Sequence, residues 1–184
     1  VWVVIFALLG GLLWVASYDW PWIGEKFDFI AQGLQHTLYL ALGGIVLAFV
    51  LACVGALARI SSNPLAYGVA GFYTSFFRGT PLIVQLFLIY LALPQFAGGL
   101  RERFPDTFGR DFVDLFILDY TVVGILALGL NYGAYMTEIF RAGIQSVSPG
   151  QSEAAEALGM SYGQKMRRVV LPQALRVIIP PTGN

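Results

Sequence analysis

The chain has 184 residues, of which 57% are hydrophobic and 12% are charged, and its mean hydropathy is +0.70. A soluble domain carries about a quarter charged residues, so this composition predicts an integral membrane protein. The 11 basic and 11 acidic residues give no net charge, and the single cysteine, Cys53, excludes an intrachain disulfide.

The first two predicted elements are membrane helices. Residues 1–16 are apolar and uncharged, and a short polar link follows over 19–28. The segment 37–58 has 22 uncharged residues, enough for a helix to cross a hydrocarbon core of roughly 30 Å at about 1.5 Å per residue. Small residues recur on this segment at every fourth position: Gly44, Ala48, Ala52 and Ala56. Because helices in lipid associate through close packing, this ridge predicts a tight contact with another helix.

The middle of the chain predicts a turn, a second crossing and a loop. The composition of residues 59–64 (RISSNP) is typical of a turn. The apolar run 65–77 is short for a crossing, so it either lies at the membrane interface or begins the next membrane helix. Residues 80–94 then run uncharged to the other side, and the polar stretch 95–119 predicts an irregular loop with room for one short helix.

The next predicted crossing, 120–137, carries two stripes of different character. A small-residue ridge is formed by Gly129, Gly133 and Thr137. A polar stripe is formed by Asn131, Tyr135 and Glu138. At about 100° per residue the two stripes lie on nearly opposite faces. One face is therefore expected to pack and the other to present polar groups.

The polar stretch 148–172, here called the elbow, predicts two short helices joined by a tight turn. Two serine–glutamine pairs have capping-box spacing, Ser148 with Gln151 and Ser161 with Gln164, and Gly159 lies between them where a helix ends. The first helix is small and acidic. The second is amphipathic, with an apolar stripe of Tyr162, Met166, Val169 and Val170. A helical elbow that projects from a membrane protein indicates a docking element, whereas a helix pair resting on lipid phosphates would not explain the small acidic first helix.

The elbow resembles the EAA loop of ABC importer permeases, in which Glu-Ala-Ala is followed at fixed distances by Gly and then by Ile-x-Leu-Pro. The matching residues span 20 positions: Glu153, Ala154, Ala155, Gly159, Leu171 and Pro172, with Val169 where Ile is usual. The runs 78–82 (RGTPL) and 134–147 (AYMTEIFRAGIQSV) are similar to those of polar amino-acid permeases. The resemblance implies that these six residues couple the chain to a cytoplasmic ATPase, whose closure the elbow transmits to the membrane helices.

The same resemblance implies an all-α fold, a polytopic membrane helix bundle of the type I ABC importer architecture with a cytoplasmic helix-turn-helix coupling loop over 148–172. It covers most of residues 33–184, which we assign to an incomplete permease transmembrane domain, truncated at its C-terminus. Residues 1–32 lie outside the family core. We assign them to an extra N-terminal transmembrane helix and a periplasmic link.

Four polar residues are candidates for the substrate path: Gln85, Asn131, Tyr135 and Glu138. Asn131 lies about 16 Å into its crossing, where an amide is costly unless it has a partner or faces a wet cavity. Asn131 therefore either lines a cavity that hydrogen-bonds an amino-acid zwitterion or makes an interhelical hydrogen bond. The same two interpretations apply to Gln85, and for Glu138 the alternative is a local ion pair with Arg141.

The lysine and arginine residues predict the orientation. With the elbow inside, seven basic residues are cytoplasmic and four lie outside, in agreement with the positive-inside rule. The inner set is Arg59, Arg78, Arg141, Lys165, Arg167, Arg168 and Arg176, and the outer set is Lys26, Arg101, Arg103 and Arg110. We therefore expect a multi-pass protein of the bacterial inner (plasma) membrane with a cytoplasmic coupling loop.

The function implied by the resemblance is that of the transmembrane subunit of an ATP-driven importer. It would move polar L-amino acids, of the glutamate, glutamine, aspartate or general class, by alternating access. The implied partners are a cytoplasmic ABC ATPase dimer, a second identical or homologous permease subunit, a periplasmic amino-acid-binding protein, membrane lipid and the amino-acid substrate. The alternatives are a permease for another small solute, or a non-transport membrane protein that presents a cytoplasmic helix pair.

Several chemistries are not expected of this chain. It has no phosphate-cradling Gly-x-x-x-x-Gly-Lys-Ser/Thr loop, so we expect it to have no ATPase site of its own, with ATP hydrolysed by the partner subunit. One histidine and one cysteine leave no metal-ligand cluster, and we expect no bound cofactor. The basic residues form no large basic surface, so nucleic acid is not an expected partner.

Overall fold

The computed structural model describes residues 1–16 and 20–183, and every regular element within them is a helix. The chain divides into two compact units, Val1–Tyr39 and Leu40–Asn184, and each is considered by itself. Among the described residues, three helices are long and apolar enough to cross a membrane: Phe27–Ile60, Leu82–Arg103 and Tyr120–Gln145. These agree with the three long predicted crossings.

The first unit consists of α1 (Trp2–Val15), α2 (Trp20–Glu25) and the start of α3 (Phe27–Ile60). The predicted apolar helix over 1–16 is confirmed as a helix, although at 14 residues it is about 21 Å long and shorter than the usual span. Its crossing of the membrane stays a prediction. The expected polar link is helical over Trp20–Glu25, whereas Asp19 lies outside the described residues.

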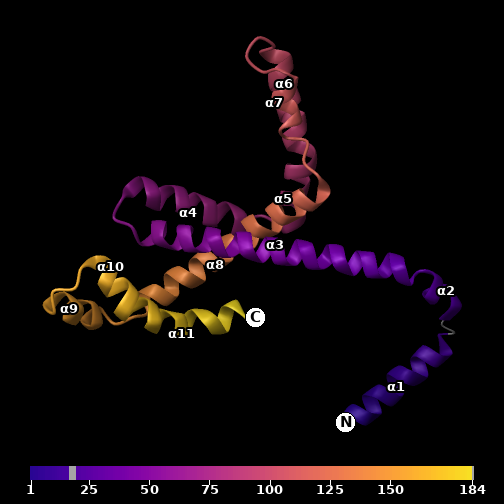
Figure 1. Ribbon diagram of the computed structural model, residues 1–184, viewed down its shortest axis with the longest axis horizontal. Coiled ribbons are helices and arrows are strands. Elements are labelled where there is room, and N and C mark those ends of the chain that lie inside the picture. The colour runs from indigo at the N-terminus through magenta and orange to yellow at the C-terminus, as the bar shows by residue number, and fades with distance from the viewer. Residues whose placement is uncertain (17–19, 184) are drawn as a thin grey trace. The chain divides into compact units, whose positions relative to one another are not determined.

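In the second unit, α3 ends at Ile60 and α4 (Pro64–Gly79) begins after a short turn, as predicted. The side chain of Asn63 caps α4 by accepting a hydrogen bond of 2.9 Å from the Leu65 amide, and Pro64 occupies the first turn, where its missing N–H costs nothing. Figure 1 shows α4 beside the end of α3. The apolar run 65–77 is therefore a separate helix that precedes the second crossing.

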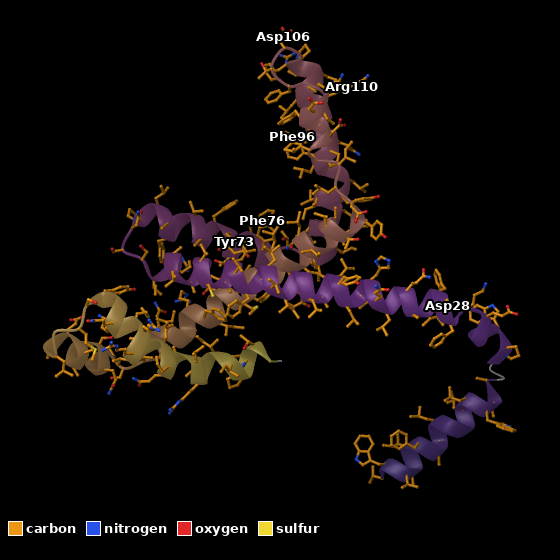
Figure 2. The ribbon with its side chains drawn as sticks, in the orientation of Figure 1. Asp28, Tyr73, Phe76, Phe96, Asp106 and Arg110 are labelled. Carbon is orange, nitrogen blue, oxygen red and sulfur yellow. The ribbon has the colours of Figure 1, made fainter. Side chains whose placement is uncertain are left out.

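The second crossing joins α5 (Leu82–Phe87), a π-helical turn η1 (Leu88–Ala92) and α6 (Leu93–Arg103). The loop predicted to begin at residue 95 is wrong there, because α6 continues through the charged residues to Arg103. The predicted short helix is present as α7 (Arg110–Asp114). A series of edge-on and tilted ring contacts links the end of α6 to α7 through Phe104, Phe108, Phe112 and Phe116. Figure 2 shows Asp106 and Arg110 near the tip of this hairpin. The aromatic contacts explain why the polar stretch is ordered.

Helix α8 (Tyr120–Gln145) is the central element of the second unit. Its small-residue ridge packs against α3, whose ridge residues Ala48, Ala52 and Ala56 are almost completely buried, so each predicted ridge does pack against another helix. The Leu47 side chain packs so closely on the α8 backbone that a Cβ at Gly129 would lie 2.5 Å from its Cδ2. Side chains as small as these allow dispersion contacts to replace the hydrophobic driving force that lipid does not supply.

The elbow follows as α9 (Pro149–Ala157), α10 (Tyr162–Lys165) and the π-helical turn η2 (Met166–Val170), which continues into α11 (Leu171–Thr182). Figure 1 shows α11 beside α8, where Ile178 packs on Gly143. Both π-helical turns lie two residues before a proline, Pro94 or Pro172. Proline cannot donate the regular backbone hydrogen bond, and the preceding leucine instead bonds to the carbonyl five residues back, Leu93 to Leu88 and Leu171 to Met166.

Candidate functional site

Two buried side-chain amides meet where α4, α5 and α8 come together. Gln85 is 2% exposed and Asn131 is 7% exposed. Asn131 Nδ2 donates to the Phe77 carbonyl at 3.0 Å and to Gln85 Oε1 at 3.2 Å. Gln85 Nε2 donates to the same carbonyl at 2.9 Å and to Thr80 Oγ1 at 2.7 Å. We call this group, made of Phe77, Thr80, Gln85 and Asn131, the amide node.

The Phe77 carbonyl accepts two amides because its regular helical donor is missing. The residue four positions later is Pro81, which has no N–H, and α4 ends at Gly79. A carbonyl left without a partner inside a membrane bundle is costly, so the amides of Gln85 and Asn131 satisfy it from two other helices. The Pro in the RGTP run thus creates the acceptor on which the node is built.

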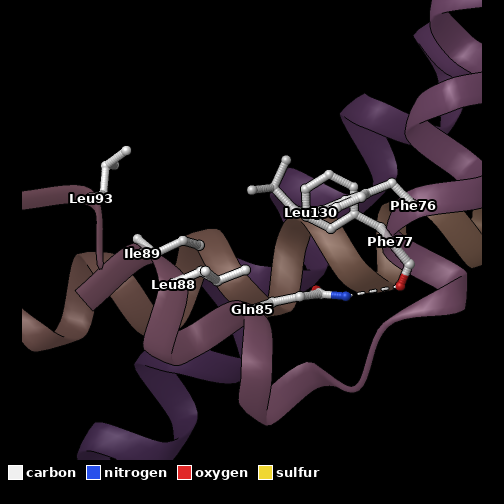
Figure 3. Close-up of a pocket in the computed structure, with 7 residues that line it drawn as sticks. All are labelled: Phe76, Phe77, Gln85, Leu88, Ile89, Leu93 and Leu130. Atoms are coloured by element: carbon white, nitrogen blue, oxygen red, sulfur yellow. Dashed lines mark hydrogen bonds between the residues drawn. The ribbon is translucent and has the colours of Figure 1, made fainter. Parts of the chain in front are cut away.

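A groove of about 870 Å³ opens beside the node. Its walls come from α3, α8, α11 and the start of α5, and its lining has no charged side chain. Polar atoms reach it from Thr80, Asn131, Tyr132, Tyr135 and Thr182. On the Gln85 side of the node lies a smaller apolar hollow of about 230 Å³, lined by Phe76, Leu88 and Leu130 among others, and shown in Figure 3 with the bond from Gln85 to the Phe77 carbonyl.

The structure distinguishes the two interpretations of the amides, a cavity wall or an interhelical hydrogen bond. Both Gln85 and Asn131 make interhelical hydrogen bonds, which was the alternative to a cavity wall. Asn131 nevertheless also lines the groove, whereas Gln85 lines the smaller hollow. Both Nδ2 hydrogens of Asn131 are used, and none of the hydrogen bonds among the described residues uses its Oδ1. That oxygen is left as an acceptor for a group in the groove.

The three residues of the predicted polar stripe have different surroundings: Asn131 and Tyr135 line the groove, and Glu138 does not. Tyr135 lines the groove with Asn131, and its hydroxyl donates to the Arg78 carbonyl at 3.5 Å. Glu138, which is not among the groove residues, instead makes ion pairs with Arg141 at 2.7 Å and with Arg59 of α3 at 3.4 Å. The alternative role of Glu138 as an ion-pair partner is therefore the one observed.

Two interhelical contacts of α8 were missed by the sequence reasoning. The Arg59 guanidinium, besides meeting Glu138, lies 4.4 Å from the ring centroid of Tyr67, and Gly71 leaves room for it. The Tyr73 hydroxyl donates to the Leu130 carbonyl at 2.8 Å. The Arg59–Glu138 and Tyr73–Leu130 contacts each join residues more than 50 positions apart, so no local sequence pattern indicates them. Together they fix α3 and α4 against α8.

The turn of the elbow is built from local hydrogen bonds. Gly159 has a φ of +73°, the left-handed conformation that favours glycine. The Met160 amide donates to the Ala155 carbonyl and the Gly159 amide to the Glu156 carbonyl, which is a Schellman motif. The predicted helix end at Gly159 is confirmed.

Of the two predicted capping boxes, one forms. At Ser161 the hydroxyl accepts from the Gln164 amide and the Gln164 side chain accepts from the Ser161 amide, as expected. At Ser148 the prediction is wrong, because its side chain makes no capping hydrogen bond. The Gln151 amide is already bonded to the Ser148 backbone carbonyl at 3.0 Å.

The six predicted coupling residues occupy different positions in the elbow. Glu153, Ala154 and Pro172 are exposed, Leu171 is half-buried, and Ala155 is buried where α9 packs on η2. A Lys165–Glu156 ion pair and a hydrogen bond of 3.4 Å from Gln173 to Gln151 brace the two arms. The small Ala155 thus lets the arms close, while Glu153 and Ala154 remain on the outer surface.

The described residues thus place an uncharged groove along one helix, α8, and a braced elbow after its C-terminal end, among helices long and apolar enough to cross a membrane. The chain belongs to the family of binding-protein-dependent transport system inner membrane components, whose family model matches residues 44–184. This family assignment argues against a non-transport protein that merely presents a helix pair.

Several relatives are permeases of amino-acid transport systems. The chain is 41% identical to the arginine transport system permease protein ArgU of Corynebacterium glutamicum, covering 98% of this chain and 58% of that protein. It is 40% identical to the histidine/lysine/arginine/ornithine transport system permease protein HisQ of Salmonella typhimurium, over 84% of this chain and 65% of that protein. It is also 37% identical to the probable amino-acid permease protein YxeN of Bacillus subtilis, over 91% and 68%. The chain thus spans between 58% and 68% of the length of these relatives.

A solved structure has the same fold. The chain superposes with a TM-score of 0.71 on a crystal structure of an amino acid ABC transporter with histidines, at 36% identity, over 91% of this chain and 70% of that one. The expected all-α membrane bundle of the type I ABC importer architecture is confirmed.

Proposed function

We propose that this chain is part of the transmembrane subunit of an ATP-driven importer that moves polar L-amino acids across a bacterial inner membrane by alternating access. The observation that carries the proposal is the continuity of α8. This unbroken helix lines the groove at Asn131 and Tyr135 and leads, three residues after Gln145, into the elbow. A displacement of the elbow is therefore passed through a short turn, residues 146–148, to the helix that forms the groove wall.

The substrate class follows from the relatives and from the groove. The relatives named above belong to transport systems for amino acids. A groove of about 870 Å³ lies within the range of small-molecule sites, roughly 300–1,000 Å³. Its few polar groups, among them Asn131 and Thr80, suit hydrogen bonding to a small polar solute in an otherwise apolar wall.

The elbow is the proposed contact with a cytoplasmic ABC ATPase dimer, which hydrolyses the ATP. Large apolar side chains are exposed on it, with Leu158 at 77% and Tyr162 at 64%, beside the exposed Glu153 and Ala154. Exposed apolar groups rimmed by charges are typical of a protein interface. The braces between the arms make the elbow a stiff lever rather than a flexible loop.

The remaining partners complete the transport cycle. A second permease subunit, identical or homologous, encloses the path, and a periplasmic binding protein delivers the amino acid. Closure of the ATPases on ATP draws the two elbows together and opens the groove outward. The elbow lies in the cytoplasm in this proposal, in keeping with the positive-inside count.

The substrate path is tested by transport in the full-length assembly with Asn131→Ala or Gln85→Ala. Uptake is measured in proteoliposomes in competition with acidic, amide, basic and apolar amino acids. We expect altered selectivity for Asn131→Ala, because Asn131 lines the groove. The matched control is Gln95→Ala, an exposed glutamine on α6. Unchanged selectivity in both node variants would remove these residues from the path.

The coupling role is tested by Gly159→Leu. A leucine cannot readily adopt a φ of +73°, so the turn between α9 and α10 should open and ATPase association should be lost while membrane insertion continues. Co-purification of the ATPase is the measurement. The control is Gly68→Leu, on α4, where the glycine has ordinary φ and open space. Normal co-purification of the Gly159 variant would contradict the docking role.

A further inference from the structure

Arg78, an exposed residue in the last turn of α4, lies two positions before Thr80, which lines the groove. Its guanidinium carbon is 5.4 Å from the centroid of the Tyr135 ring, and the Tyr135 hydroxyl donates to the Arg78 carbonyl. Tyr135 is itself a groove residue. The side chain is therefore held beside the groove by the ring on which it rests, a contact of the cation–π type.

Arg78 differs from the other interacting basic residues of the inner set. Arg59 and Arg141 share Glu138, and Lys165 pairs with Glu156. Among the described residues, Arg78 has no carboxylate within ion-pair distance and its guanidinium donates no hydrogen bond. Its five N–H groups form a planar fork that matches the two oxygens of a carboxylate. Next to an uncharged groove, this fork is a ready site for an oxyanion.

The groove supplies complementary groups for the rest of an amino acid. Asn131 lies one turn from Tyr135, about 6 Å along α8, and its Oδ1 is left as an acceptor. Tyr132 lines the same wall, and a tyrosine ring attracts a cation to its face. The Tyr132 ring therefore offers a partner to the α-ammonium group, and Asn131 Oδ1 is left to accept a hydrogen bond from the variable side chain.

We infer that Arg78 binds the α-carboxylate of the transported amino acid while that molecule lies in the groove. The inference rests on the proposed function. Because the α-carboxylate is common to all amino acids, Arg78 sets the class of substrate, whereas the groove wall near Asn131 and Thr80 faces the variable side chain. The other source of an oxyanion is a lipid phosphate at the membrane surface, and the experiment distinguishes the two.

The test uses the full-length permease complex with its ATPase, in nanodiscs and without a binding protein, so that the binding measured is that of the membrane subunits. The probes are tritiated L-arginine, L-histidine, L-glutamine and L-glutamate, each competed with itself and with its α-carboxamide. We expect at least one amino acid to bind, with its carboxamide about tenfold or more weaker. In Arg78→Gln, binding of that amino acid should weaken about 10- to 100-fold, the range for a charge-assisted pair, and the preference over the carboxamide should disappear.

Two further variants make the result specific to the guanidinium. Arg78→Lys keeps the charge but not the fork, so it should keep the preference for the carboxylate with affinity about three- to tenfold weaker. If Arg78→Gln does not assemble, Arg78→Lys tests the proposal alone. An amino-acid affinity equal to that of the wild-type complex would then overturn it. Arg176→Gln, an exposed arginine on α11, is the matched control and should leave affinity and preference unchanged.

The remaining outcomes separate the alternatives. The wild-type complex and Arg78→Gln are compared in phosphatidylcholine alone and in phosphatidylcholine mixed with phosphatidylglycerol. If Arg78→Gln alters only the dependence on phosphatidylglycerol and keeps the preference for the carboxylate, Arg78 serves a lipid phosphate and the proposal is overturned. If the wild-type complex binds none of the four amino acids, the proposed function itself fails.

Discussion

The bundle and the elbow both depend on glycine, for opposite reasons. At Gly129, in the contact between α3 and α8, an added Cβ would lie 2.5 Å from Leu47, while the backbone conformation is an ordinary helix. At Gly159, in the elbow, no atom lies within 4 Å of an added Cβ, but φ is +73°. The bundle needs glycine for space, and the elbow needs it for backbone conformation.

This difference shows how the two regions hold their shape. In the bundle, residues far apart in the sequence approach closely, so stability depends on side-chain volume. In the elbow, backbone hydrogen bonds between neighbours set the turn, and Ala155 and Val170 are buried. Volume changes are therefore expected to damage the bundle most, and conformational changes the elbow.

The largest effect is expected for Gly129→Val. The added atoms overlap Leu47, and overpacking of this kind costs about 3 kcal/mol, at the upper end of its usual range. Thermal unfolding of the purified full-length complex measures the loss. Adding Leu47→Ala should recover part of it, because that change vacates the overlapped space. Gly68→Ala, in open space on α4, is the control, and an equal loss there would show that volume is not the cause.

The next largest effect is expected for Glu138→Gln, which should lower the free energy of unfolding by about 2 kcal/mol. The change leaves Arg59 and Arg141 without their shared partner, and the three side chains are only 16–29% exposed. Removing one member of a fully buried pair costs more, about 3–5 kcal/mol, and partial exposure reduces it. The same unfolding measurement applies, with the exposed Glu102→Gln as control. Equal stabilities of the two variants would show that the cluster does not hold α3 to α8.

Gly159→Ala should cost about 1.5 kcal/mol, because an L-residue pays roughly 1–2 kcal/mol in the left-handed region. The effect is local, so it is read from amide hydrogen exchange in the elbow, which should accelerate about tenfold at Met160. Gly163→Ala, at an elbow glycine of ordinary φ, is the matched change. If both variants exchange at the same rate, the turn does not depend on the glycine.

The smallest effects separate the two serine caps. Ser161→Ala removes a formed capping box and should destabilise α10 by about 1 kcal/mol, which is roughly a fivefold change in exchange at Gln164. Ser148→Ala should change exchange in α9 very little, since that side chain makes no capping hydrogen bond. A larger effect at Ser148 would mean that its cap forms in the assembled protein.

Much of the bundle was predictable because its signals are local. The period of four in Gly44, Ala48 and Ala52 identified the face of α3 that packs, and the length of the uncharged run identified its crossing. The extent of α6 was not predictable from composition, because the polar stretch is ordered by ring contacts: Phe104 meets Phe108, and Phe108 meets Phe112 of α7. The failed cap at Ser148 has a similar cause: the spacing was right, but the backbone had already used the donor.

The sequence by itself determined the membrane class, the packing ridges and the turn of the elbow, because hydropathy, helical period and the conformational freedom of Gly159 act over a few residues. Only the tertiary structure decided the roles of the polar side chains. Asn131 and Gln85 are 46 positions apart and meet on a carbonyl freed by Pro81, and Glu138 meets Arg59 across 79 positions. A buried polar group must find a partner, and the fold determines which one lies within reach.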